Sequence, residues 1–387
     1  MSGSMKLFRL WGIDVQVHWS FLLILIYGAI IYSGGPAGPL VGALYGILVI
    51  LLLFACVVLH EFGHAVTAKY FGIRVPYITL LPIGGVAQLE RMPQKPLQEF
   101  LIAIAGPMVN FVLAALLAPL ATLAFGLKVQ NGGAAASAQS LLAQMQTPGL
   151  TGLLLYLAAT NLLLGLFNLL PAFPMDGGRI LRALLAMSMP YVQATRVAVA
   201  VGRFMAILFA IWGIAGGGIM LLLIAFFVYV GGQGELEMTE SRYVLRDIRV
   251  KEALTPGAQA LFVTDRLAKV VDLIMHTYQT DFPIFDLSNR FVGVLTRGRL
   301  VQALREFGPE ARVADVMIPR EQIPVARPEE SLADVWDRML EQHSRVVAVE
   351  DGGQFLGLIT MEDITELIQV LGATMERAML QEAQSPA

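Results

Sequence analysis

His60-Glu61-Phe62-Gly63-His64 follows a long apolar stretch, since Trp19 to Leu59 contains no Asp, Glu, Lys or Arg. On a helix, two histidines four residues apart project from one face, as zinc ligands must, and the glutamate between them lies where a general base is needed. An ionisable or metal-binding residue in a bilayer is costly, so its presence there indicates a functional site. The apolar surroundings distinguish this stretch from the same pattern in a soluble metalloprotease.

Charge divides the 387-residue chain into two unlike parts. Residues 1–232 hold 11 Lys or Arg and 5 Asp or Glu, whereas residues 233–387 hold 16 and 25. The first part therefore has the composition of a membrane domain with net charge +6, and the second that of a soluble domain with net charge −9. We expect an integral multi-pass membrane protein with the lipid bilayer around its first part and no nucleic-acid partner.

Six segments are predicted as spanning helices, because a span needs about 20 apolar residues. They are 18–34, 40–68, 98–125, 150–174, 195–213 and 214–232. Residues 177–189 look like a helical continuation of the fourth segment. The short apolar stretch 79–89, with Pro82 and the pair Gly84-Gly85, cannot span and predicts a re-entrant hairpin, buried in protein or lining a wet cavity.

Basic residues alternate between the short loops, which predicts the orientation. They are Lys6 and Arg9 at the N-terminus, Lys69, Arg74, Arg91 and Lys95 after the second span, Lys128 after the third, and Arg179, Arg182 and Arg196 after the fourth. This alternation predicts a cytosolic N-terminal segment (1–17) and a cytosolic C-terminal domain. We expect the membrane to be a prokaryotic cell (inner) membrane. The histidine pair would then lie closer to the cytosolic face.

A catalytic zinc site takes three protein ligands and leaves one position for water. His60 and His64 supply two of them. We expect Asp176 to be the third, because a lone acid in an apolar region has few structural explanations. Pro171 and Gly177 would interrupt the helix beside it and free backbone groups.

Glu61 points about 100° away from His60 around a helix, so it does not share the same metal without distortion. It can instead reach a water beside the metal and act as general base. A peptide oxyanion also needs a neutral hydrogen-bond donor besides zinc. Asn168 is the expected donor, while Asn110 and Asn161 are alternatives that more often bond helix to helix.

Three motifs together resemble the site-2 protease family of intramembrane zinc metalloproteases. They are His60-Glu61-Phe62-Gly63-His64, then Gly106-Pro107-Met108-Val109-Asn110, similar to the family's G-P-x-x-N, and Asn168-x-x-Pro171-x-x-x-x-Asp176-Gly177, similar to its N-x-x-P-x-x-x-x-D-G. The resemblance implies that His60, His64 and Asp176 bind one Zn²⁺ ion. It also implies that Glu61 is the base and that Asn168 helps to hold the oxyanion.

The same resemblance implies a substrate. Residues 18–232 would be a protease domain that cleaves single-span membrane proteins in regulated intramembrane proteolysis. The hairpin at Gly84 and Gly85 resembles the family's re-entrant β-loop, whose edge can pair with an unwound substrate.

An internal repeat marks the soluble part. Gly293-Val294-Leu295-Thr296 matches Gly357-Leu358-Ile359-Thr360 at an offset of 64 residues, which predicts two copies of a β-α-β-β-α module. These resemble a tandem pair of cystathionine-β-synthase (CBS) domains. The expected boundaries are 233–245 for a linker, 246–305 and 312–371 for the two CBS domains, and 372–387 for a C-terminal tail.

CBS pairs commonly bind adenine nucleotides such as ATP or AMP, so this resemblance implies control by a nucleotide. The family's ribose-binding pattern, T/S-x-x-D, is present at Thr360 and Asp363. The first repeat has Thr296 but carries Arg299 in place of the acid, and an arginine cannot accept hydrogen bonds from ribose hydroxyls. The alternative is a structural or dimerising module without ligand, which would form a homodimer through these domains.

The leading interpretation is a zinc-dependent intramembrane endopeptidase, and there are two alternatives. CBS pairs also occur on metal-dependent transporters, but those usually show repeats in the membrane part, and none is evident here. A catalytically silent substrate-binding scaffold is the other, and the complete set of ligands and base argues against it. The expected fold is an α-helical polytopic membrane domain of about six spans with a re-entrant β-hairpin, followed by an α/β tandem CBS domain.

Overall fold

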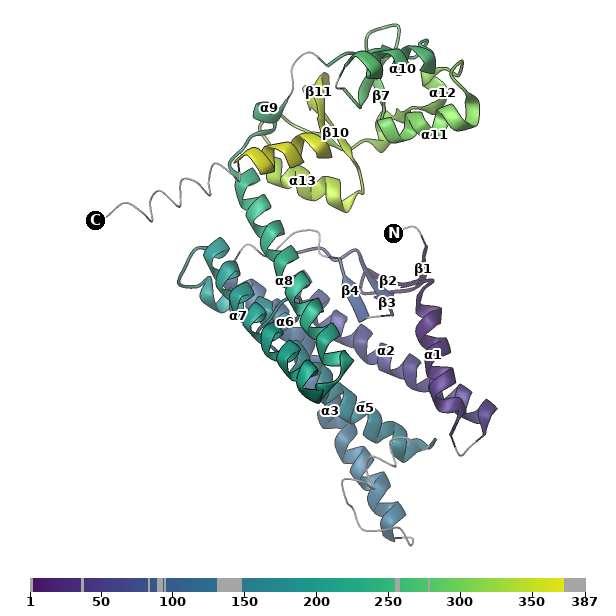
Figure 1. The fold of residues 1–387 in the computed structure, drawn as a ribbon, viewed down its shortest axis with the longest axis vertical. Coiled ribbons are helices and arrows are strands. Elements are labelled where there is room, and N and C mark those ends of the chain that lie inside the picture. The colour runs from purple at the N-terminus through teal and green to yellow at the C-terminus, as the bar shows by residue number, and fades with distance from the viewer. Residues whose placement is uncertain are drawn as a thin grey trace, which may run out of the picture. The chain divides into compact units, whose positions relative to one another are not determined.

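The computed structural model describes residues 3–35, 38–82, 84–88, 93, 95–130, 148–254, 258–277 and 279–371, without the side chains of 125–130. The chain divides into two compact units, unit 1 (Met1–Glu237) and unit 2 (Met238–Ala387), each described by itself below (Figure 1). The predicted tail 372–387 lies outside the described residues.

Unit 1 consists mainly of helices (Figure 1). They are α1 (Phe21–Ser33), α2 (Pro39–Tyr70), α3 (Pro96–Gln130), α5 (Leu150–Asn168), α6 (Asp176–Leu185), α7 (Tyr191–Trp212), the π-helix η1 (Gly213–Gly217) and α8 (Ile219–Arg246). Among the described residues, α2, α3, α5, α7 with η1, and α8 are long and apolar enough to cross a membrane. The first predicted span, 18–34, holds the shorter 13-residue α1, because a strand occupies the chain up to His18.

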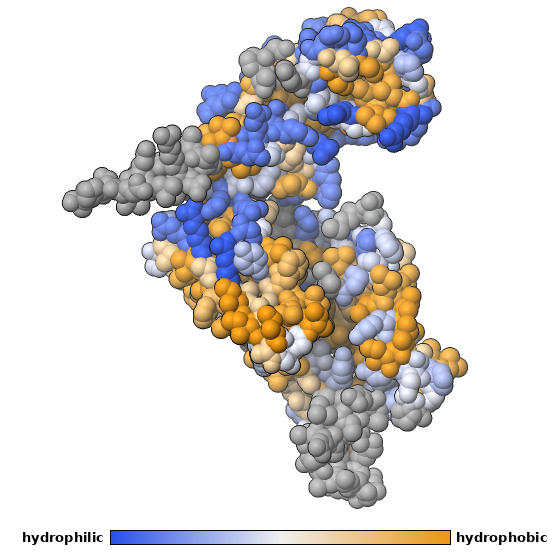
Figure 2. Space-filling model, viewed as in Figure 1, coloured by the Kyte–Doolittle hydropathy of each residue, from blue (hydrophilic) through white to orange (hydrophobic). Residues whose placement is uncertain are grey.

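Much of the helix surface in unit 1 is apolar. Leu22, Leu116 and Phe226 are 60%, 62% and 69% exposed, and Figure 2 shows hydrophobic residues covering most of the visible helix surface of this unit. An exposed apolar surface of this extent on helices of spanning length is one that faces lipid. The chain is therefore an integral membrane protein.

A four-stranded sheet lies on the second helix. Its strands are β1 (Ser4–Leu10), β2 (Ile13–His18), β3 (Tyr77–Leu81) and β4 (Gly84–Ala87), in the order β1-β2-β3-β4. Strands β2 and β3 are parallel, and the other two pairs are antiparallel. The hairpin expected at 79–89 is thus β3–β4, and it shares a sheet with the N-terminal segment.

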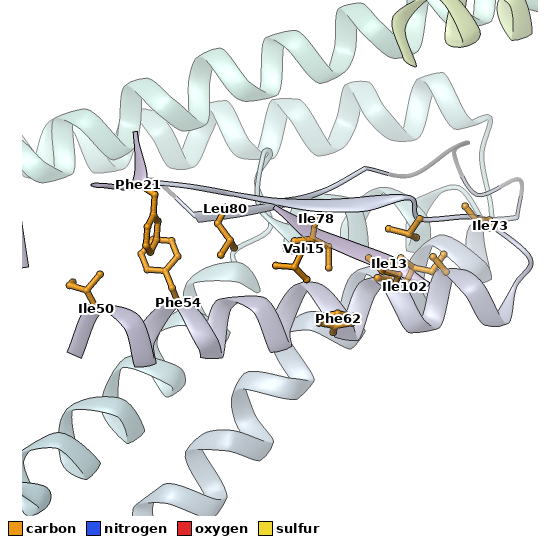
Figure 3. Packing of buried hydrophobic residues seen from close by; sticks show 13 residues of the cluster. Ile13, Val15, Phe21, Ile50, Phe54, Phe62, Ile73, Ile78, Leu80 and Ile102 are labelled. Atoms are coloured by element: carbon orange, nitrogen blue, oxygen red, sulfur yellow. The ribbon is translucent and has the colours of Figure 1, made fainter. Parts of the chain in front are cut away.

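The sheet packs on α2 through alternate side chains. In β2, Ile13 and Val15 are fully buried while Asp14 between them is not, which is the period-2 pattern of a strand with one covered face. Figure 3 shows Ile13, Val15 and Leu80 of the sheet above α2, whose Phe54 belongs to the same core. This core holds the α2 segment with the histidine pair against the hairpin.

The helix break expected near Pro171 is present. Helix α5 ends at Asn168, and α6 begins at Asp176. Proline lacks a backbone N–H and cannot continue a helix, so Pro171 and Pro174 keep the intervening residues non-helical. The fourth predicted span, 150–174, therefore ends six residues earlier, and the acid starts a new helix.

Unit 2 contains the predicted repeat. The first copy comprises α9 (Val250–Ala253), β5 (Leu261–Phe262), α10 (Leu267–His276), β6 (Phe282–Phe285), β7 (Phe291–Leu295) and α11 (Arg297–Phe307). The second comprises α12 (Val313–Val316), β8 (Ile318–Pro319), the 3₁₀ turn η2 (Arg320–Gln322), β9 (Val325–Ala326), α13 (Leu332–Glu341), β10 (Val346–Asp351), β11 (Gln354–Thr360) and a helix over 361–371. The pairing is the same in both copies: β5 and β6, like β9 and β10, are parallel, whereas β6 and β7, like β10 and β11, are antiparallel.

The two copies exchange their first short helices. Val250 of α9 packs in the core formed by the second copy, with Val335, whereas Val313 of α12 packs in the core of the first copy, with Leu267. Each hydrophobic core of unit 2 therefore includes residues from both of the predicted segments 246–305 and 312–371. Residues 233–245, expected as a linker, are a continuous part of α8.

Candidate metal centre

The described part of the chain brings together one group of His, Cys, Asp or Glu side chains that could hold a metal ion: His60, His64 and Asp176. Helix α2 supplies both histidines one turn apart, and the first residue of α6 supplies the acid. The two imidazole Nε2 atoms are 3.1 Å apart, and Asp176 Oδ2 lies 3.3 Å from His60 Nε2 and 3.2 Å from His64 Nε2. The predicted ligands thus meet at one point.

The second nitrogen of each ring decides which atom faces that point. His64 Nδ1 lies 2.7 Å from the carbonyl oxygen of Ile102, which only accepts, so Nδ1 carries the proton. His60 Nδ1 lies 2.5 Å from Asn110 Oδ1. The Asn110 amide nitrogen donates to Asn161 Oδ1, so the atom that faces His60 is the accepting oxygen and His60 Nδ1 carries the proton. In neutral imidazoles this leaves both Nε2 lone pairs aimed at the carboxylate.

Three lone-pair donors in mutual contact repel one another unless a cation lies between them. Asp176 Oδ2 is buried and has no hydrogen-bond donor in the described part of the chain, which fits that requirement. In a tetrahedral zinc site with bonds of about 2.0–2.1 Å, two donor atoms are about 3.3–3.4 Å apart. The observed separations of 3.1–3.3 Å agree with zinc, so the residues present fit the metal that the sequence predicts.

A glycine on α3 makes room for the two rings. A Cβ atom at Gly106 would lie 2.7 Å from His60 Nε2 and would also overlap the His64 ring. A Cβ at Gly63, on the α2 side of the contact, would lie 2.8 Å from the Ala105 carbonyl oxygen. Glycines therefore let the α3 backbone approach α2 closely enough for the Ile102 carbonyl and Asn110 to bond the imidazoles.

Glu61 lies against the hairpin, beside the ligand triangle. A Cβ atom at Gly85 in β4 would lie 2.7 Å from Glu61 Cγ, so strand and carboxylate are in contact. Glu61 also lies close enough to His64, His60 and Asp176 to interact with them electrostatically. The candidate base is thus placed between the metal ligands and an edge strand.

The three candidate asparagines have different surroundings. Asn110 and Asn161 are fully buried, and their bond joins α3 to α5, as expected of helix-to-helix contacts. Asn110 also orients a candidate ligand, which the sequence reading did not assign to it. Asn168 Nδ2 donates to the Leu164 carbonyl oxygen at 3.0 Å at the end of α5, which uses one of the two amide hydrogens.

A second buried polar cluster was missed from the sequence. Arg182 of α6 is 1% exposed; its Nε donates to Glu99 Oε1 of α3 at 2.9 Å and its Nη1 to Glu235 Oε1 of α8 at 2.6 Å. The guanidinium carbon lies 4.9 Å from the ring centres of both Phe173 and Tyr191. Arg182 is therefore a buried ion-pair partner and not the loop charge that was counted for the orientation. Its signal was an acid at the start of a long apolar helix, Glu99 in the first turn of α3, and a basic residue in the last turn of α6.

The candidate nucleotide residues lie in unit 2. Asp363 Oδ2 accepts hydrogen bonds from the backbone N and the hydroxyl of Thr360, both at 2.8 Å. In the first copy, Thr296 Oγ1 accepts from the backbone N of Arg299 at 3.3 Å, and the Arg299 Nε donates to the Val316 carbonyl oxygen at 3.0 Å. Thr360 Oγ1 likewise accepts from the backbone N of Asp363 at 3.1 Å, so both copies form the same helix-start contact while the residue at the third position carries the opposite charge.

Comparisons with known proteins identify both parts of the chain. The model for Peptidase family M50 matches residues 48–211, and the model for the CBS domain matches residues 313–370, in the second repeat. The zinc metalloprotease MJ0392 of Methanocaldococcus jannaschii is 31% identical over 96% of this chain and 98% of its own length. Rip3 of Mycobacterium tuberculosis is 30% identical over 96% of this chain and 94% of its own length. A solved site-2 protease from Methanocaldococcus jannaschii is 35% identical and covers 60% of this chain and 95% of its own, with a TM-score of 0.41.

Replacing Arg182 with Met should destabilise unit 1 by about 3–5 kcal/mol, because Glu99 would stay buried without the guanidinium that it accepts from. Arg182→Lys should lose less, since it keeps the charge but not the planar fork. The midpoint of thermal unfolding in detergent measures this, with Arg305→Met, at an exposed position, as control. Equal midpoints for Arg182→Met and wild type would show that the cluster contributes nothing.

Proposed function

Because this chain belongs to peptidase family M50, the site-2 protease family of zinc metalloproteases, we propose that it cleaves membrane-spanning segments of other proteins within the bilayer. The observation that carries this proposal is the convergence of His60 Nε2, His64 Nε2 and Asp176 Oδ2 in a unit built from helices of spanning length. A soluble peptidase would have no need to place such a site among apolar helices. A transporter or a silent scaffold would not explain the glutamate beside it.

We assign His60, His64 and Asp176 to one zinc ion. When bound, zinc supplies a Lewis acid that polarises the scissile carbonyl and makes a neighbouring water more acidic. The Ile102 carbonyl and the Asn110 amide hold the two imidazoles in the tautomer that ligation requires. Asp176 starts α6, so the rigid helix fixes the carboxylate.

Glu61 is the proposed general base. Its side chain lies beside the ligand triangle and against Gly85, and it can accept a proton from the attacking water and return it to the leaving amine. Asn168 is the proposed neutral donor to the oxyanion, with the amide hydrogen that Leu164 does not take. Charge that develops on the carbonyl oxygen would then be met by a fixed dipole.

Strand β4 is the proposed substrate platform. It is an edge of the four-stranded sheet, and Gln88 N donates to Tyr77 O on β3, so along the strand the N–H groups of Gly85 and Ala87 point to the free edge. An unwound substrate segment can pair there by strand addition. Because Gly85 contacts Glu61, the paired segment would lie next to the base.

We infer that the substrates are single-span membrane proteins and that the N-terminus and unit 2 lie in the cytosol of a prokaryotic cell, with the protease in its cell membrane. Lys69 in the last turn of α2 and Arg74 after that helix support this orientation by the positive-inside rule. Arg182 no longer counts toward it. Lys128 lies outside the described side chains.

Unit 2 is proposed to bind an adenine nucleotide that modulates cleavage, with Thr360 and Asp363 at the ribose, and to form a homodimer. Asp363 supplies the acceptor that ribose hydroxyls need. Helix α8 begins in unit 1 and ends in unit 2 without interruption, so a change in unit 2 on nucleotide binding could be transmitted to unit 1 along this helix. Glu235, on that helix, bonds Arg182 of α6.

Glu61→Gln should lower cleavage by about 10²–10⁴-fold, since the amide cannot take a proton, while zinc stays bound. The assay is cleavage of a single-span substrate in liposomes together with metal analysis of the same sample. Glu366→Gln, at an exposed position, is the control. If Glu61→Gln with full zinc cut the substrate at the wild-type rate, another group would have to be the base.

Ala87→Pro should raise KM for a membrane substrate several-fold with little change in kcat, because it removes one outward N–H from the edge of β4. Ala87→Ser keeps that N–H and is the matched control. Unchanged zinc content in both variants shows that the metal ligands remain in place. Equal KM values for the two variants would rule out strand pairing at this edge.

Saturating ATP should raise the unfolding temperature of the intact protein, and Asp363→Asn should weaken ATP binding about tenfold or more, since a charged acceptor is lost. Calorimetry on the detergent-solubilised protein measures both, with Glu366→Gln as the control. Should ATP leave both thermal stability and cleavage unchanged, nucleotide control would be abandoned.

A further inference from the structure

The N-terminal strand of unit 1 carries an exposed apolar face. Strand β1 is one edge of the four-stranded sheet, and Figure 1 shows it beside the start of α1. Phe8 of β1 lies opposite Val15 of β2, and Leu10 in the same way lies opposite Ile13. Residues opposite each other on paired strands point to the same face. The two β2 residues are fully buried against α2, whereas Phe8 and Leu10 are 47% and 42% exposed. The buried face of β2 therefore continues into an exposed apolar face on β1.

The other face of β1 is basic. Arg9 lies opposite Asp14, which is on the face of β2 that points away from α2. Lys6 Nζ and Arg9 Nε both pair with the Asp14 carboxylate, at 2.7 Å and 3.3 Å. Lys69, in the last turn of α2, donates from Nζ to the Trp11 carbonyl oxygen. Three cations and one acid thus gather at this end of the sheet, which gives it a net positive charge.

A tryptophan occupies an unfavourable backbone position in the turn between β1 and β2. Trp11 and Gly12 both have positive φ, 50° and 80°, as in a two-residue hairpin turn of type I′. Such turns favour Asn, Asp or Gly, and a bulky residue in the left-handed region costs free energy. Trp11 is 64% exposed, and its ring meets Phe62 of α2 edge-on with ring centres 5.7 Å apart. Packing inside the protein uses little of this ring, so the indole is available to a contact outside the chain.

Helix α1 indicates how deep the strand lies. The helix has 13 residues and is therefore about 20 Å long, whereas the hydrocarbon core of a bilayer is about 30 Å thick. Strand β2 ends at His18, and α1 begins at Phe21. Figure 3 shows Phe21 beside Phe54 of α2, with Val15 and Ile13 further along the same helix. The paired strands therefore continue the path of α1 toward the membrane surface.

The backbone and the residue types of β1 suit the headgroup layer rather than the hydrocarbon core. An edge strand has unpaired N–H and C=O groups, which are not tolerated in hydrocarbon but find water, phosphate and ester partners at the membrane surface. Tryptophan is enriched in this layer, and Lys and Arg side chains reach headgroups from it. The apolar face of β1 adjoins α1, whose exposed Leu22 is part of the lipid-facing helix surface.

We propose that β1 and the turn at Trp11 form a lipid-binding surface at the border of the bilayer. Phe8 and Leu10 contact the acyl chains nearest the headgroups, and the indole of Trp11 anchors the turn. Lys6 and Arg9 attract anionic phospholipid headgroups. Because β1 and β4 are the two edges of one sheet, lipid contact at β1 also fixes the depth of β4. This surface does not depend on the protease activity, so the two proposals can fail separately.

The test is fluorescence quenching of Trp11 by brominated lipids. The intact, zinc-loaded protein with Trp19→Phe, Trp212→Phe and Trp336→Phe is reconstituted in phosphatidylcholine vesicles. Lipid brominated near the headgroup should quench Trp11 more strongly than lipid brominated near the chain end. The matched control keeps only Trp336, on α13 of unit 2, and should be quenched by neither lipid. In the otherwise native protein, Trp11→Phe should remove the same quenched fraction, so the result does not depend on the triple substitution.

Headgroup preference is tested in the same vesicles. At equal mole fraction, brominated phosphatidylglycerol should quench Trp11 more than brominated phosphatidylcholine, because one basic residue enriches anionic lipid about fivefold. Salt should reduce this excess. Lys6→Gln with Arg9→Gln should remove the excess but keep the quenching by phosphatidylcholine. Lys251→Gln with Arg305→Gln, at exposed positions of unit 2, removes the same charge and should change neither.

Two results would overturn the proposal. One is a Trp11 that the shallow bromine does not quench, as expected if a second copy of the chain pairs with β1 and covers it. The other is equal quenching by the two headgroups in the wild type, which would show that the basic face does not select anionic lipid.

Discussion

Unit 1 is organised around three lone pairs that point at the same place. Each imidazole has its other nitrogen engaged, by the Ile102 carbonyl or by Asn110, so neither ring can turn away from Asp176 Oδ2. Such an arrangement is stable only with a cation at its centre. It also requires α2, α3 and the start of α6 to meet within a few ångströms, and this requirement accounts for the glycine at position 106 and for the break between α5 and α6.

Buried charge in the same unit follows the rule that it must be paired. Arg182 brings together a glutamate from α3 and one from α8, while its own helix carries Asp176 at its start. The cluster therefore fixes α6 to α3, whose backbone carbonyl and asparagine hold the two histidines. It also fastens the helix that runs on into unit 2. The metal ligands and the last helix of unit 1 are connected by this one guanidinium.

Unit 2 shows duplication followed by divergence in charge. Both copies keep the strand pairing and a threonine, Thr296 or Thr360, just before the helix that follows the antiparallel strands. The equivalent residues Phe291 and Phe355 stack on one another. The exchange of the short helices α9 and α12 between cores ties the copies together, so neither folds around its own residues alone.

The sequence by itself determined the membrane and soluble parts, the repeat, the helix break and the candidate ligands, because each depends on local pattern: apolar runs, proline positions and motif spacing. Five of the six predicted spans correspond to helices of spanning length, and α1 falls short because β2 runs to His18 and a turn separates it from Phe21. Only the tertiary structure decided which groups hold the histidines, that Arg182 is buried between two glutamates, and that Arg299 and Arg345 share a cavity. Those contacts join residues far apart in the chain, and no local pattern encodes which distant partner satisfies a buried polar group.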